Sequence, residues 1–248
     1  MKQGFLIPVY RHGKSACLIA EHLASMGLIV ILVDDGNDKE TRDLLADFAA
    51  KTRGVELVRL EKNSGKGGAI IRGIEKAKEL GIDHVLQIDA DGQHDSGKAG
   101  FFLEQSAVHP DMVICGLPEF DETAPKSRLS GRKISTFWAS IATLSTELKD
   151  LLCGFRVYPV DAVWRITRSP FLDKRMGFDV EILVRLYWKK VYPLFLPVKV
   201  NYPQDGISNF NVVRDNIRIS LVFTRLCVGM LIRLPLLIFR KIRRRKAR

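Results

Sequence analysis

Short apolar runs alternate with segments of helical periodicity along the first half of the chain, and this alternation restricts the fold more than any other feature. The apolar runs are FLIPV (5–9), LIVILV (28–33), VELVRL (55–60), HVLQID (84–89) and MVICG (112–116). Helical spacing of apolar residues covers 14–26, 38–52, 66–80 and 97–108. Buried parallel strands are almost wholly apolar, and repeated strand–helix units with short connections are typical of a doubly wound sheet. We therefore expect an α/β fold with a mainly parallel sheet.

Polar, glycine-containing loops follow each of the first four predicted strands. Their sequences are YRHGKS (10–15), DDGNDKET (34–41), EKNSGKGGA (61–69) and DADGQHD (89–95). A single such loop could serve only to cap a helix, since Asp, Asn and Gly are common at helix starts. Ligands of doubly wound sheets bind beyond the carboxyl ends of the strands. Four such loops at one sheet edge therefore favour a binding site.

The fourth loop has the composition of a divalent metal site. Asp89, Asp91 and Gln93 alternate along an extended segment and offer oxygen ligands, which suit Mg²⁺ or Mn²⁺. An EF-hand is excluded, because the sixth and twelfth positions from Asp89 hold His and Gly in place of Gly and Glu. Helix capping explains Asp95 but not Asp89, since a carboxylate after an apolar run is costly to bury alone.

The third loop, NSGKGGA (63–69), matches neither common phosphate motif. The Walker pattern fails because Gly follows Lys66, and the dinucleotide fingerprint fails because Ile70 occupies its last position. A glycine-rich turn that enters a helix still offers backbone N–H groups and one Lys. We expect this turn to bind an anion or a nucleotide.

Basic residues are concentrated at the C-terminus. The net charge is +11, but the last nine residues, RKIRRRKAR, hold seven basic side chains, and the remainder carries only about +4. The preceding segment 217–239 is apolar yet contains Arg225 and Arg233, which are costly at a bilayer centre. Arginines 214, 218, 225, 233 and 240 fall on one side of a helix.

This pattern predicts a domain over 1–210 and, over 211–248, an amphipathic helix kinked near Pro235 with a polybasic tail at an anionic membrane surface. A core-packing or dimerising helix is the alternative. Nucleic-acid binding is not expected, because no recognition motif accompanies the tail. The N-terminus lacks the long apolar region of a signal peptide, and the four Cys are far apart. We expect reduced, buried cysteines and a cytoplasmic protein, peripheral on the inner face of the cell membrane.

Six segments, in order, carry a resemblance to a known family: IPVY, VDDGNDKET, NSGKGGAIIRGIEKA, IDADGQHD, CGFRVYP and GFDVEIL. Over residues 4–210 the chain resembles the family 2 glycosyltransferases of the GT-A fold, closest to the dolichyl-phosphate mannose synthase and polyprenyl-phosphate sugar transferase branch. The resemblance implies a UDP- or GDP-sugar donor, a Mg²⁺ or Mn²⁺ cofactor, and inverting transfer to a membrane lipid, either a polyprenyl phosphate or a lipid hydroxyl.

The resemblance also implies roles for single residues. Asp89 and Asp91, with Gln93, hold the metal, and Asp91 counts as catalytic through it. The donor contacts are Pro8, Tyr10, Asp34, Asp35, Lys66, Asp89, Ala90, Arg128 and Arg132. Among these, Asp34 and Asp35 contact the base and ribose, and Arg128 or Arg132 reaches the diphosphate from a mobile loop. The segment Cys153–Gly154–Phe155 borders the acceptor.

The need for a protein base depends on the acceptor. A phosphate is nucleophilic at neutral pH, whereas a hydroxyl needs a carboxylate within hydrogen-bond reach. Asp179 and Glu181 lie at i, i+2 of a predicted helix and cannot share a face; we expect Asp179 to be the base. CGLPEF (115–120) lacks the basic residue that many members of the branch carry, which weakens the phosphate-acceptor assignment. Two other functions remain open: a sugar-nucleotidyltransferase, or a non-catalytic membrane-surface protein.

Overall fold

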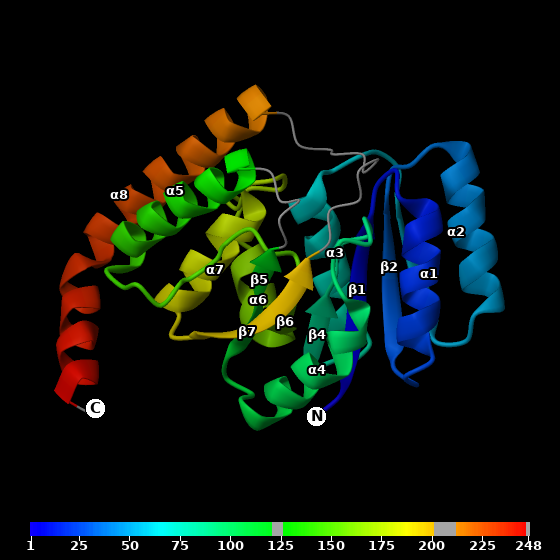
Figure 1. Cartoon of the computed structure of the whole chain (residues 1–248), viewed down its shortest axis with the longest axis horizontal. Coiled ribbons are helices and arrows are strands. Elements are labelled where there is room, and N and C mark those ends of the chain that lie inside the picture. Colours follow the sequence, from blue (N-terminus) through cyan, green and yellow to red (C-terminus); the bar gives the residue numbers. More distant parts are fainter. Residues whose placement is uncertain (121–125, 201–211, 247–248) are drawn as a thin grey trace.

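A seven-stranded sheet forms the centre of the computed structural model, which describes residues 1–120, 126–200 and 212–246 (Figure 1). The strands are β1 (Gln3–Val9), β2 (Ile29–Asp35), β3 (Val55–Leu60), β4 (His84–Gln87), β5 (Val113–Phe120), β6 (Arg156–Pro159) and β7 (Pro193–Val200). The helices are α1 (Gly13–Ala24), α2 (Lys39–Lys51), α3 (Lys66–Glu79), the 3₁₀ turn η1 (Ser96–Lys98), α4 (Ala99–Val108), α5 (Lys126–Thr143), α6 (Val160–Thr167), α7 (Phe178–Trp188) and α8 (Val212–Lys246). The predicted α/β class is confirmed.

The strands lie in the order β3-β2-β1-β4-β6-β5-β7, and every pair is parallel except those made by β6. β6 runs antiparallel to both β4 and β5. The carboxyl ends of the parallel strands therefore meet at one edge, and β6 brings its first residue to that same edge. Arg156 pairs with Gln87 there, two residues before Asp89. The sheet is mainly parallel and doubly wound, as predicted.

Alternating strand residues fill two cores, one on each face of the sheet. Leu6 of β1 belongs to a core that α3, α5, α6, α7 and α8 complete, whereas Phe5 and Ile7 belong to a second core with α1, α2 and α4. Successive strand side chains point to opposite faces, so a continuous apolar run can serve both cores. This requirement explains why β1 and β2 are almost wholly apolar, whereas the edge strand β3 includes Glu56 and Arg59.

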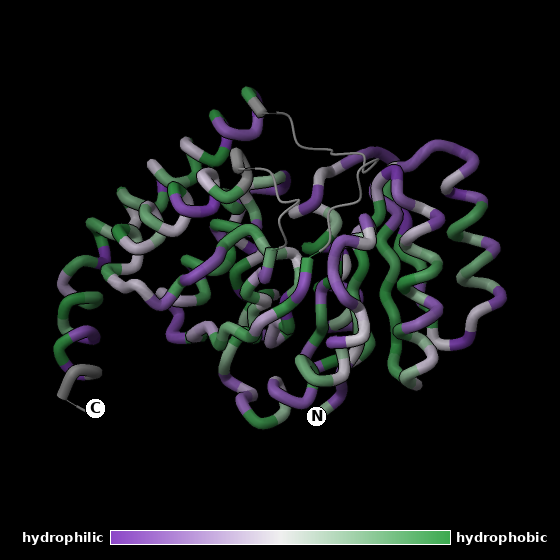
Figure 2. The backbone as a smooth tube through the Cα atoms, viewed as in Figure 1, coloured by the Kyte–Doolittle hydropathy of each residue, from purple (hydrophilic) through white to green (hydrophobic). Residues whose placement is uncertain are grey.

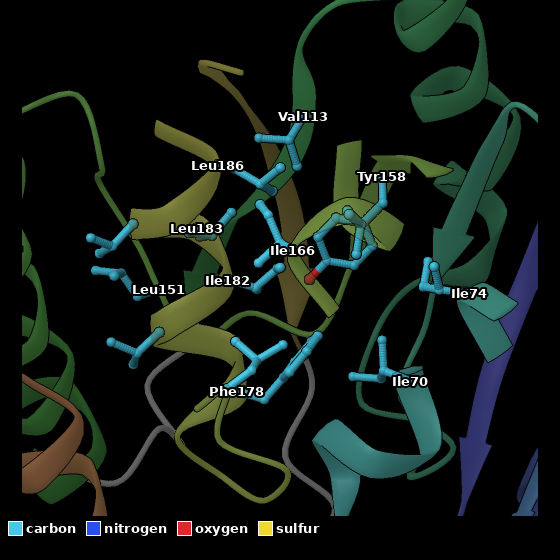
Figure 3. Packing of buried hydrophobic residues seen from close by; sticks show 14 of the residues in the cluster. Ile70, Ile74, Val113, Leu151, Tyr158, Ile166, Phe178, Ile182, Leu183 and Leu186 are labelled. Carbon is cyan, nitrogen blue, oxygen red and sulfur yellow. The ribbon is translucent and has the colours of Figure 1, made fainter. Parts of the chain in front are cut away.

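The larger core joins α7 to the middle of the sheet. Figure 3 shows Phe178 and Ile182 of α7 facing Ile70 and Ile74 of α3, with Tyr158 of β6 between the two helices. All five side chains are fully buried. Burial of side chains of this size stabilises a fold by about 1.5–3 kcal/mol each. This packing fixes the first turn of α7 beside the first turn of α3.

Helix α8 lies beside α5, and its axis changes direction in its C-terminal half (Figure 1), as expected for a helix with an internal proline, here Pro235. It is the one helix of the described residues long and apolar enough to cross a membrane. Apolar and polar residues alternate along it (Figure 2). Val222, Phe223 and Leu226 are buried against the domain, whereas about half of its large apolar side chains are exposed.

Several boundaries differ from the sequence predictions by one or more residues, as at β4, which ends at Gln87, before the predicted residue 89. The sequence did not predict β6, α6 or β7. Cys115 and Cys153 are buried, but Cys17 and Cys227 are only half-buried, so the expectation for those two was wrong; all four are unpaired. The predicted domain boundary at 210 lies outside the described residues.

Candidate active site

Lys66 is the centre of a partly buried charge cluster at the carboxyl edge of the sheet. It is the first residue of α3, and its Nζ lies 2.9 Å from Oδ2 of Asp89 and 2.8 Å from Oδ2 of Asp179. Burial opposes its charge, but the two carboxylates outweigh burial and raise the pKa of Lys66. Burial likewise opposes the charge of Asp89, and Lys66 outweighs it and lowers the pKa of that carboxyl. Lys66 and Asp89 are therefore both charged at neutral pH.

The carboxylate of Asp89 is held in a fitted space. Gln87 Nε2 donates to Asp89 Oδ1 at 3.2 Å and to the carbonyl of Gly154 at 3.3 Å. A Cβ on Gly154 would lie 2.0 Å from Asp89 Oδ2 and 2.3 Å from its Cγ, much closer than a real contact. Only glycine fits at position 154 while Asp89 keeps this orientation, and the segment that leads into β6 places that glycine at the site.

Asp91 and His94 adjoin this cluster, since the charge of each interacts with that of Asp89. Burial, followed by the charge of Asp89, raises the pKa of Asp91, and burial lowers the pKa of His94. His94 Nδ1 is buried without a hydrogen-bond partner in the described part of the chain. Gln93 is half-buried, and its backbone N–H donates to Asp91 Oδ1 at 3.1 Å.

These residues fit a divalent cation whose coordination shell is completed by a bound ligand. No group of three or more His, Cys, Asp or Glu within residues 1–120, 126–200 and 212–246 is arranged as a closed metal site. Mg²⁺ is usually held by one or two carboxylates together with water and substrate phosphates, so Asp89 and Asp91 are sufficient donors. His94 Nδ1 is buried without a partner in the described residues, but His94 does not form a three-residue metal-binding group with the two aspartates there. The metal role of Gln93 stays a prediction.

Asp179 and Glu181 face different partners, as their helical spacing requires. Asp179 contacts Lys66, and its Oδ1 lies 3.7 Å from Nη1 of the fully buried Arg156. Arg156 also donates to the carbonyls of Asp179 at 2.9 Å and Leu151 at 2.6 Å. Glu181 is fully buried among arginines on another side of α7. Asp179 alone of the pair joins the Lys66 cluster.

Asp34 and Asp35, at the end of β2, organise the neighbouring loops. Asp34 Oδ1 accepts from the backbone and side chain of Asn37, and its Oδ2 pairs with Arg59 at 3.3 Å. Asp35 accepts from Ser64 N and Oγ, both at 2.7 Å, and from Gly65 N at 3.0 Å. Burial, opposed by these hydrogen bonds, raises the pKa of Asp35. Their contacts with a base and ribose stay a prediction.

The other predicted donor residues lie around this edge. Pro8 ends β1 with Val9, Tyr10 follows and stacks under Arg11 at 5.0 Å, and Ala90 is buried between the two aspartates. Arg132 lies on helix α5 and pairs with Asp150 at 2.5 Å, so its placement in a mobile loop was wrong. Arg128 also belongs to α5, but its side chain lies outside the described residues.

The model of the family described as "Glycosyl transferase family 2" matches residues 6–167, which contain the aspartates of the cluster except Asp179. The chain belongs to glycosyl transferase family 2. Its identification as a glycosyltransferase confirms the sequence-based prediction and favours it over the nucleotidyltransferase and the non-catalytic alternatives.

Two relatives of this glycosyltransferase are named for transfer to a lipid phosphate. It is 29% identical over 207 residues to a dolichyl-phosphate beta-glucosyltransferase of Dictyostelium discoideum, covering 77% of this chain and 62% of that protein. It is 28% identical over 185 residues to an undecaprenyl-phosphate mannosyltransferase of Micrococcus luteus, covering 73% and 75%. The chain thus spans less than two thirds of the Dictyostelium protein. These relatives support the predicted polyprenyl-phosphate branch of the family.

Solved structures confirm the GT-A fold. The glucosyl-3-phosphoglycerate synthase of Mycobacterium tuberculosis superposes with a TM-score of 0.67 at 13% identity, covering 91% of this chain and 80% of that one. That structure was determined with Mn²⁺, UDP and glucosyl-3-phosphoglycerate. At this identity the likeness concerns the fold alone.

Sequence reasoning missed two residues that shape the site, Gln87 and Arg156, and it did not foresee the tight fit of Gly154 against Asp89. Gln87 stands inside an apolar run, and Arg156 follows Gly154–Phe155 at the start of an unpredicted strand. A polar residue within a buried run is a usable signal, because it needs a partner. The contact of Gly154 with Asp89 left no such signal, because it depends on the antiparallel placement of β6.

Proposed function

We propose that this glycosyltransferase moves a sugar from a UDP- or GDP-sugar to a polyprenyl phosphate at a membrane surface, with a divalent metal and with inversion at the anomeric carbon. The Lys66 cluster is the observation that carries the proposal. It places one cation and two carboxylates at the sheet edge where doubly wound folds bind nucleotides.

The proposed roles follow from charge. Asp89 and Asp91 hold Mg²⁺ or Mn²⁺, which when bound neutralises charge that develops on the leaving diphosphate. Lys66 supplies a second positive charge beside the diphosphate. Asp34 and Asp35 hold the loops on which the base and ribose rest, and Pro8, Tyr10 and Ala90 line that pocket. Arg132 on α5 approaches the diphosphate, and the donor contact of Arg128 stays a prediction.

A phosphate acceptor agrees better with the geometry than a hydroxyl acceptor. Asp179 Oδ2 is engaged by Lys66 Nζ at 2.8 Å, and its Oδ1 faces Arg156, so it is poorly placed to take a proton from a hydroxyl. A phosphate needs no base at neutral pH. The relatives named for dolichyl phosphate and undecaprenyl phosphate point the same way. We therefore propose that Asp179 orients Lys66 in place of acting as a base.

Membrane association is suggested by the lipid-phosphate relatives and by α8. We propose peripheral attachment on the cytoplasmic face, through an apolar face defined by two helices. The exposed side chains of this α5–α8 face are Ile134, Phe137, Trp138, Ile217, Leu221, Val228, Leu231, Ile232, Leu236 and Phe239. Seven basic residues end the chain and complement anionic headgroups.

A paired acceptor assay tests the activity. Purified full-length chain with Mn²⁺ or Mg²⁺ is given a panel of UDP- and GDP-sugars with undecaprenyl or dolichyl phosphate, or with the matching free polyprenol, and the lipid product is analysed by mass spectrometry. We expect product from one donor and the phosphate only, and its loss in Asp91→Asn. Product from the polyprenol alone would overturn the phosphate assignment, and no product with any donor would overturn the proposed activity.

Vesicle flotation tests the α5–α8 face. The triple variant Leu221→Ser, Val228→Ser and Ile232→Ser removes apolar side chains that are 65%, 54% and 76% exposed, so folding is preserved. We expect it to float less well than wild type with anionic vesicles. Leu18→Ser, on an exposed position of α1, serves as the control. Equal flotation of the triple variant and wild type contradicts the proposed attachment.

A further inference from the structure

Two carboxylates near the site are held by arginines of the C-terminal helix. Arg225 Nη2 of α8 lies 2.6 Å from Oε2 of Glu181, whose side chain is fully buried. Arg218 Nε lies 3.7 Å from Oδ2 of Asp173. Arg185 of α7 occupies the other oxygen of Glu181 at 2.6 Å. Two of the five arginines predicted to share one side of the helix, Arg218 and Arg225, thus face the domain, and their ion pairs attach α8 to the domain.

The segment 173–177 connects these contacts to the nucleotide loops. Asp173 N donates to Glu181 Oε2 at 2.9 Å, and Arg175 N donates to Asp173 Oδ1 at 2.7 Å. Arg175 Nη1 then donates to Asn63 Oδ1 at 3.1 Å. The carbonyl of Lys174 accepts from the backbone of Gly68 at 2.8 Å, in the first turn of α3. The segment therefore bridges α8 and the loop that leads to Lys66.

Close packing leaves this bridge little freedom. A Cβ on Gly177 would lie 2.8 Å from Cγ2 of Val222 on α8, and a Cβ on Gly67 would lie 2.5 Å from Cβ of Phe178. Glu181 follows Asp179 by two residues in the first turn of α7. A shift of this turn therefore moves Asp179 relative to Lys66.

We propose that Arg225 and Glu181 are positioning residues for the donor site, so that α8 holds the nucleotide loop and Asp179 in place on one side while it meets the membrane on the other. This inference rests on the proposed function for the identity of the donor. Its structural content, the link from α8 to residues 63–68, stands independently of that function. Neither residue touches the Lys66 cluster directly, so any effect on binding must pass through segment 173–177 and α7.

Hydrogen exchange on the ligand-free full-length chain tests the link. Arg225→Gln removes the ion pair, Arg225→Lys keeps its charge, and Arg233→Gln removes one charge from the same helix at a residue that instead stacks on Trp188 at 4.5 Å. We expect faster amide exchange in 63–68 and 173–183 for Arg225→Gln, partial recovery in Arg225→Lys, and wild-type exchange there in Arg233→Gln. Unchanged exchange in Arg225→Gln, or equal acceleration in Arg233→Gln, overturns the inference.

Nucleotide binding then tests the functional consequence. UDP and GDP are titrated separately, in the presence of Mn²⁺, into the same variants. We expect Arg225→Gln to weaken the affinity by about tenfold at most, because Arg225 lies further from the metal than the direct partners of metal ligands, whose loss costs about 10–100-fold. We expect Arg225→Lys to restore most of the affinity. Wild-type affinity in Arg225→Gln overturns the positioning role. If the wild-type chain binds neither nucleotide, the proposed function fails, and the exchange data alone decide whether the link exists.

Discussion

Replacement of Gly154 by alanine separates folding from ligand binding. The added Cβ would lie 2.0 Å from Oδ2 and 2.3 Å from Cγ of Asp89. An ordinary carbon–oxygen contact is about 3.3 Å or longer, so the carboxylate must withdraw by roughly 1.3 Å. Because the obstructing atoms end a side chain, the fold can accept the methyl group by rotating Asp89. That rotation takes the carboxylate away from Lys66 and from the proposed metal position.

The two consequences differ in size. Overpacking costs about 1–3 kcal/mol, which in a chain of this length lowers the Tm by roughly 2–12 °C. A misplacement of about 1 Å at a reacting centre costs on the order of a hundredfold in rate. We therefore expect a folded variant with a moderately lower Tm and about a hundredfold lower turnover with the donor found in the acceptor assay.

Differential scanning fluorimetry and titration of Mn²⁺ with UDP or GDP measure the two effects on one preparation. Gly100→Ala on α4 is the matched control, since a Cβ there meets nothing within 4 Å. A Gly154→Ala variant that binds the metal and nucleotide like wild type would refute the assignment of Asp89 to the metal. A variant that is unfolded at room temperature would refute the argument that Asp89 can rotate to make room for the methyl group.

Three further predictions concern other parts of the molecule. His84 is buried, and burial lowers its pKa. Below about pH 6.5 the unfolded chain therefore binds a proton at His84 more readily than the folded chain does, and the free energy of unfolding decreases as the pH is lowered. His84→Gln is expected to lose less Tm between pH 7 and pH 5 than wild type, and parallel losses would contradict this. Phe137→Ser with Trp138→Ser, at side chains 59% and 41% exposed, is expected to reduce flotation with anionic vesicles, whereas Phe101→Ser on α4 should not. Arg156→Met removes the buried donor to the carbonyls of Leu151 and Asp179 and is expected to cost about 3 kcal/mol in urea unfolding, with Arg53→Met, at an exposed position, as the unaffected control.

The sheet and the acidic loop could be predicted from the sequence because their causes are local. Strands buried on both faces must be continuously apolar, and the runs at 5–9 and 28–33 meet that condition directly. Asp89 and Asp91 follow such a strand, so the alternation of strands and helices was enough to predict that they lie at the carboxyl edge of the sheet. The capping role of Asp95 is confirmed by its hydrogen bond from Gly97 N at 3.0 Å.

The remainder depends on contacts between distant segments. Nothing local in 153–159 indicates that β6 enters the sheet antiparallel between β4 and β5, and without that placement the fit of Gly154 against Asp89 cannot be foreseen. The sequence also did not determine whether the arginines on one side of α8 face the domain or the solvent. Periodicity located one side of α8, but the partners Glu181 and Asp173, which draw Arg225 and Arg218 toward the domain, come from elsewhere in the chain.

The position of β6 also sets an order of events during synthesis. The strands β3, β2, β1 and β4 are contiguous in the sheet and are all made before residue 88, so they can associate as soon as they leave the ribosome. At about 5–20 residues per second, Gly154 follows only after several seconds. Until then Asp89 lies at an open sheet edge, exposed to mispairing with other nascent chains. The charged loop that ends β4 thus borders an open edge of the growing protein until β6 closes it, and the Lys66 cluster is complete only when Asp179 of α7 has followed.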